Sequence, residues 1–160
     1  AIMKPLLPTQ LAAAILQATG EADVQRKSLG KKLTEAALHQ RLTGLSNIIV
    51  KLFADPAGEL PRDFDSRVNQ VLFLSNDPRS TGLVNQKAGN LVDRAAKLPT
   101  DNPAAIADEL FLSAFSRRPT EEETKEVEQY LTGLTDKKRI EALQELTWAF
   151  ITSAEFRFNH

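Results

Sequence analysis

The chain has no cysteine, and it has few histidine and aromatic residues. Without cysteine, these 160 residues cannot contain a disulfide, a thiolate metal site, an iron–sulfur cluster, a catalytic thiol or a covalently attached c-type haem. The two histidines, His39 and His160, are far apart, and neither has a second histidine at metal-ligand spacing. Aromatic residues make up only 6% of the chain, so the core must be mostly aliphatic. We therefore assign no catalytic residue, cofactor or metal ion from the sequence.

Long apolar runs and an excess of one charge are also missing. No apolar stretch approaches the roughly 20 residues that a membrane-spanning helix needs, so we predict no membrane insertion. Twenty Lys+Arg face twenty-one Asp+Glu, scattered along the chain. This balance removes the electrostatic basis for nucleic-acid binding. In the opening AIMKPLLPTQ, Pro5 and Pro8 interrupt a very short apolar run, which is not typical of a signal peptide.

The pattern of apolar residues favours helices throughout. Length and average composition suit one globular domain, so we predict a single all-α domain over residues 1–160, an irregular bundle of about six or seven short helices. In the first half, Thr9 is the expected cap of the first helix, Gly44 an expected break, and Ile48 an expected core residue. We expect a helix over 10–19, a loop over 21–32, and helices over 34–42 and 46–53. A turn-rich loop should follow over 54–65, and then a helix that begins at residue 66 and ends at Asn76-Asp77-Pro78.

The second half of the chain contains clearer sequence signals for the starts and ends of helices. After a short helix over 90–98, Asn102 and Pro103 predict the start of a helix that runs to residue 116. Thr120 and Glu123 then form a Thr-x-x-Glu capping box, in which each side chain binds the other residue's exposed backbone N–H. The inner face of this helix should include Tyr130. A last helix should run over 136–154 on a regular apolar stripe.

These segments resemble a known family. The sequences ELFLSAFSRRPTEEE and LTWAFITSAEFRFNH, together with NQVLFLSNDP and LPTQLAAAILQATG, are similar to the C-terminal domain of unknown function 1553, which is typical of large planctomycete and related bacterial proteins. The resemblance implies that the chain is the C-terminal part of a larger, exported, multidomain protein located in the periplasm or at the cell surface. It implies no catalytic residues, and the haem motif of some relatives is absent here.

Two groups of residues are candidates for contact with a partner. Arg117 and Arg118 could hold an acidic partner, but pairing with a carboxylate on a neighbouring helix is the favoured interpretation. Trp148, Phe156 and Phe158 could stack on a sugar or a partner protein, and core packing is favoured for the two phenylalanines. The possible interaction residues are therefore Arg118, Trp148, Phe156 and Phe158.

Two hypotheses for function remain open. The first is a non-catalytic structural or protein-interaction module, whose partner is a neighbouring domain of the parent, another protein or a glycan. The alternative is an accessory domain that forms part of the site of a polysaccharide-related or redox enzyme. In that case the loop carboxylates, namely Asp55, Glu59, Asp63, Asp65 and Asp77, should point into a shared cleft. For the four carboxylates between residues 55 and 65, solvated turn residues are favoured over a calcium site, because they lack the ordered pattern of a calcium loop.

Overall fold

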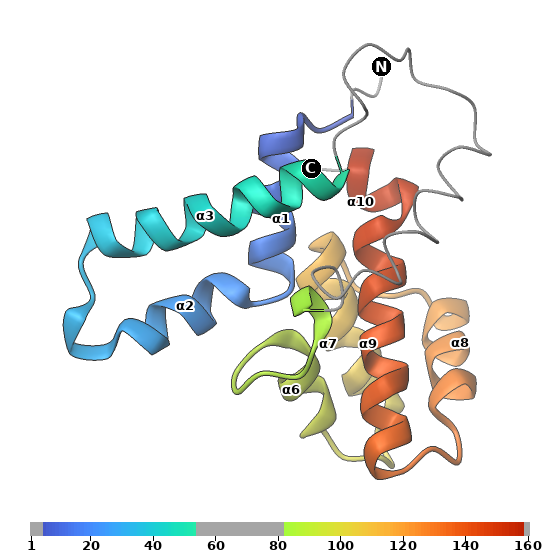
Figure 1. Ribbon diagram of the computed structural model, residues 1–160. Helices are drawn as coiled ribbons and strands as arrows, with labels where there is room; N and C mark the ends of the chain where they lie inside the picture. Colours follow the sequence, from blue (N-terminus) through green and yellow to red (C-terminus); the bar gives the residue numbers. More distant parts are fainter. Residues whose placement is uncertain (1–4, 54–81, 159–160) are drawn as a thin grey trace.

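The computed structural model describes residues 5–53 and 82–158, and this part of the chain is helical with no strand (Figure 1). Its elements are α1 (Pro8–Ala18), α2 (Glu21–Leu29), the 3-10 turn η1 (Gly30–Lys32), α3 (Glu35–Phe53), α6 (Leu91–Ala96), α7 (Pro103–Phe115), α8 (Glu121–Leu131), α9 (Asp136–Thr152) and α10 (Ala154–Phe158). The prediction of an all-α bundle is confirmed. The predicted loop over 54–65, the helix after residue 66 and the carboxylates on both lie outside the described residues.

One contiguous apolar core joins most of these helices. Its most deeply buried residues are aliphatic, as the composition predicts, and they include Ile15 of α1, Ile49 of α3, Leu110 of α7 and Leu143 of α9. α7 packs against α8, α6 packs against α9, and α1 packs against α3. Figure 1 shows α2 and α3 extending as a hairpin away from the helices α6 to α9. Within the described residues, no helix is both long and apolar enough to cross a membrane.

The expected loop over 21–32 is wrong, because most of it forms α2. This helix has almost no apolar face, which is why periodicity missed it. Acidic residues lie in its first turn and basic residues in its last turn, the distribution that the helix dipole favours. Gly20 lies between α1 and α2 with a φ of 76°, and an added Cβ would come within 3.0 Å of the Arg94 guanidinium. A left-handed glycine therefore makes this sharp junction.

α3 corrects the prediction of two helices separated at Gly44. Glycine costs only about 1 kcal/mol inside a helix, and packing of α3 on α1 and α2 offsets that cost. Ile48, the expected core residue, is 42% exposed, whereas its neighbour Ile49 is buried. The start of α1 also differs, since Pro8 takes the first helical position and Leu7 the cap position. The Gln10 side chain accepts a hydrogen bond from the Leu7 N–H at 3.0 Å, so Thr9 is not the cap.

The predicted boundaries of the C-terminal helices are confirmed to within a few residues. Asn102 accepts from the Ala105 N–H at 3.1 Å to cap α7. Thr120 accepts from the Glu123 N–H at 3.2 Å, while the Glu123 carboxylate accepts from the Thr120 N–H at 2.7 Å. This reciprocal pair is the expected capping box. The prediction for Tyr130 is wrong: this residue is 46% exposed on α8 and does not face inward. Its hydroxyl group donates a hydrogen bond to Glu145 of α9.

Candidate functional site

Arg117 forms the centre of a charged cluster that joins three C-terminal segments. Its guanidinium donates to both carboxylate oxygens of Glu123 at 2.9 and 2.7 Å, and to both carboxylate oxygens of Glu155 at 2.8 and 3.1 Å. Glu123 stands in the first turn of α8, and Glu155 stands in α10. Bidentate pairing of this kind fixes direction as well as distance. The residue therefore connects the turn after α7 to α8 and to the end of the chain.

Electrostatics within the cluster favour the charged forms of its members. Arg117 holds the pKa of Glu123 at about 2, below its ordinary 4.5, with help from the Thr120 N–H. The hydrogen bonds that Arg117 donates to Glu123, and then those to Glu155, raise the pKa of Arg117 above its ordinary range. The guanidinium also lies over the rings of Phe111 and Phe115, at 5.1 and 5.6 Å from their centroids. Cation–π contact adds to the ion pairs, so Arg117 is already fully engaged inside the molecule.

The four predicted interaction residues differ in how exposed they are. Phe156 is only 1% exposed and belongs to the core, so a partner could not reach it in this arrangement. Trp148 and Phe158 are partly buried. Arg118 is the most exposed of the four, and its guanidinium pairs with Asp108 of α7 at 3.1 Å. Pairing with a neighbouring carboxylate, the favoured interpretation for both arginines, is found for Arg117 and Arg118 alike.

A backbone contact places the beginning of α1 beside α10. The Leu6 N–H donates to the Arg157 carbonyl at 2.9 Å. Leu7, the next residue, is 63% exposed, the largest exposed fraction among the large apolar side chains of the described residues. We call the exposed surface at Leu7, beside the end of α10, the terminal edge. Its position follows from a long-range pairing that sequence periodicity could not reveal.

A second polar cluster joins α2 to the segment before α6. Glu21 is 2% exposed, and its carboxylate accepts from Lys87 Nζ and Gln25 Nε2, both at 2.7 Å. Nearby, Arg94 pairs with Glu109 at 2.7 Å and donates to the Gly89 carbonyl at 3.1 Å. The sequence analysis did not predict this cluster, because its members come from distant segments. Its groups satisfy one another, which indicates a structural junction.

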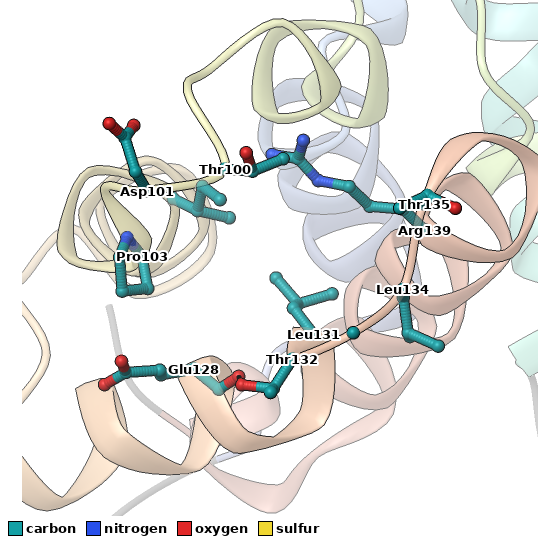
Figure 2. A pocket seen from close by; sticks show the side chains of 11 residues that line it. Thr100, Asp101, Pro103, Glu128, Leu131, Thr132, Leu134, Thr135 and Arg139 are labelled. Atoms are coloured by element: carbon teal, nitrogen blue, oxygen red, sulfur yellow. Dashed lines mark hydrogen bonds between the residues drawn. The ribbon is translucent and has the colours of Figure 1, made fainter.

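A cavity of about 350 Å³ lies where the start of α7, the end of α8 and the start of α9 meet (Figure 2). Arg139 extends from α9 along this cavity toward Thr100, while Asp101 and Glu128 lie on the far side from α9. Ile106, Leu131 and Leu134 contribute apolar wall. Sequence analysis missed Arg139, although a signal existed: it stands four residues before the fully buried Leu143 on the inward stripe of α9.

The described residues contain no group of three or more histidine, cysteine, aspartate or glutamate side chains arranged to hold a metal ion. No family model, curated protein or solved structure matches the chain. The candidate sites therefore rest on geometry alone. They are the Arg117 cluster, the terminal edge and the cavity beside Arg139.

Proposed function

We propose that the chain is a non-catalytic structural or protein-interaction module of a larger exported bacterial protein, and that it docks through the terminal edge. The observation that carries this proposal is the highly exposed Leu7 held beside α10 by the bond from Leu6 N–H to the Arg157 carbonyl. The family resemblance of the C-terminal sequence supports the exported, multidomain parent. The partner is a neighbouring domain of that parent or another protein.

Docking at this edge would work by removing apolar surface from water. Burial contributes about 25 cal/mol for each Å² of apolar surface, so an exposed leucine on a pre-formed edge is a useful anchor. The edge needs little reordering, because the backbone bond to Arg157 fixes its shape. Arg118 would act on the polar rim, where an exposed charge mainly affects association rate and salt dependence.

Hydrogen exchange in the full-length protein tests this proposal. The amides of residues 6–10 and 154–158 should exchange more slowly in the full-length protein, or in a mixture with the partner, than in the 160-residue chain. Leu7→Asp should remove this additional protection, because it places a charge in the contact. Leu112→Asp is the matched control, since Leu112 is an exposed leucine on α7. Equal exchange in both proteins would contradict docking at the terminal edge.

The alternative function, an accessory wall of an enzyme site, depends on carboxylates that lie outside the described residues. No observation on the described helices favours a glycan partner over a protein partner. The interaction module is therefore the single function that we propose here.

A further inference from the structure

Among the described residues, no carboxylate pairs with the largely buried guanidinium of Arg139. Arg139 is 9% exposed, and its one hydrogen bond runs from Nη2 to the Leu98 carbonyl at 2.9 Å. It forms no ion pair with any carboxylate of the described residues. Arginine stays protonated in proteins, and a charge removed from water is costly unless hydrogen bonds and an opposite charge compensate it. The other arginines with buried surroundings, Arg94 and Arg117, both have such carboxylates.

The unpaired guanidinium borders the cavity of about 350 Å³. One N–H donates to the Leu98 carbonyl in the loop after α6, and the other N–H groups have no partner among the described residues. Figure 2 shows the guanidinium beside Thr100 at the edge of the cavity. A guanidinium presents these groups in a planar fork that matches the two oxygens of a carboxylate. Filling the cavity with a carboxylate would supply both the missing acceptors and the missing charge.

The residues on the far side of the cavity indicate which other groups a ligand should carry. Asp101 and Glu128 line it, and neither takes part in an ion pair among the described residues. Two carboxylates disfavour a doubly charged anion such as phosphate, and they favour a ligand with a cationic end. Between the two ends, Ile106, Leu131 and Leu134 offer apolar wall to an aliphatic body. The volume is at the lower end of ordinary small-molecule sites.

We propose that this cavity binds a small zwitterionic monocarboxylate whose two charges lie at opposite ends of an aliphatic body. Arg139 anchors its carboxylate, and Asp101 and Glu128 lie at the end that receives its ammonium group. A linear ω-amino acid such as 6-aminohexanoate has this chemistry, whereas an α-amino acid carries both charges on one carbon. The site is separate from the terminal edge, so it does not depend on the interaction role proposed above.

Binding to the 160-residue chain can be measured by NMR titration, following the Arg139 side-chain Nε–H and the backbone amides of residues 131–135. The probes are 6-aminohexanoate, hexanoate, which lacks the ammonium group, hexylamine, which lacks the carboxylate, and inorganic phosphate. We expect 6-aminohexanoate to bind most tightly and to shift the Arg139 signal. Tightest binding by phosphate, equal binding by hexylamine or hexanoate, or no shift with 6-aminohexanoate would each overturn the proposal.

Two substitutions locate the site. Arg139→Met should weaken 6-aminohexanoate binding by about tenfold to a hundredfold, the range expected for a charge-assisted hydrogen bond. Arg118→Met removes the same charge from an exposed position and should leave the Kd unchanged. Thr132→Trp adds bulk to the cavity wall without changing Arg139, and it should abolish binding by filling the cavity. This second variant tests the site even if Arg139→Met does not fold. Unchanged affinity for 6-aminohexanoate in folded Arg139→Met or in Thr132→Trp would exclude this cavity.

Discussion

The helices from α7 to α10 and the helices from α1 to α3 are held in place by different means. In the C-terminal set, local caps fix the helix ends, and Arg117 joins three segments through two carboxylates. In the N-terminal set, α2 has no side-chain cap, and its one buried residue, Glu21, pairs with Lys87, 66 positions away. The comparison teaches that helix ends are readable from sequence where their partners are local, and hidden where their partners are distant.

The largest expected effect tests the apolar core of the C-terminal set. Phe156→Ala should lower the free energy of unfolding by about 3–5 kcal/mol, because it leaves a cavity where a fully buried ring stood. Phe158→Ala is the matched control and should cost less than about 1.5 kcal/mol, since Phe158 is only partly buried. Urea unfolding measures both. Equal losses would mean that Phe156 is not the core residue of α10.

Removing Arg117 tests the charged cluster. Arg117→Met leaves Glu123 and Glu155 close together without a cation, and we expect a loss of about 1–3 kcal/mol at pH 7. The partial exposure of these side chains favours the lower half of that range. Arg118→Met removes an exposed pair and should cost under about 1 kcal/mol. A loss no larger for Arg117→Met than for Arg118→Met would contradict the role given to the cluster.

The same cluster should make stability depend on acid. Glu123 has a pKa of about 2 in the folded chain and an ordinary value of 4.5. Its contribution is therefore complete above the ordinary pKa and is lost as the pH falls toward 2. In Arg117→Met the pKa of Glu123 should return toward 4.5, so the decline in unfolding free energy between these two pH values should become shallower. Urea unfolding as a function of pH compares the two slopes, and identical slopes would argue against the pairing.

An effect of similar size, but confined to α2, is expected where a distant ion pair holds the N-terminal set. Lys87→Met should leave the Glu21 carboxylate buried without its cation, at a cost of about 1–2 kcal/mol. Because the loss is local, amide exchange should accelerate in α2 and not in α8. Arg26→Met, which breaks an exposed pair with Asp23 on the same helix, should change little. Uniform acceleration over the whole chain would show that α2 is not separately anchored.

The smallest expected effect has the opposite sign. Gly44→Ala should stabilise the chain by about 0.5–1 kcal/mol, because Gly44 lies inside α3 and an added Cβ meets no atom within 4 Å. Gly20→Ala should instead destabilise it, since its φ is 76° and the added Cβ would approach Asn90 Cα at 3.2 Å. Thermal unfolding measures both changes. A destabilising Gly44→Ala would indicate that α3 is interrupted there after all.

The sequence predicts those helix ends whose stabilising partners lie close by in the chain. The Asn102 and Thr120 caps and the start of α9 at Asp136 were predicted, because each depends on residues within one helical turn. α2 was not predicted, because its stabilising contact comes from Lys87. Arg139 was overlooked because the cavity beside it forms only when α7, α8 and α9 come together. Tertiary partners, which no periodicity encodes, account for both omissions.

The two carboxylates around Arg117 also suggest an order of assembly. Glu123 lies six residues away along the chain, while Glu155 lies 38 residues away. The entropy cost of closing a loop grows with its length, so the hairpin of α7 and α8 can close its pair before α10 arrives. Contacts of Arg117 with Glu123 should therefore already be present in the folding transition state, whereas those with Glu155 form later. The Arg117 guanidinium would thus form one contact early in folding, with Glu123, and the other late, with Glu155.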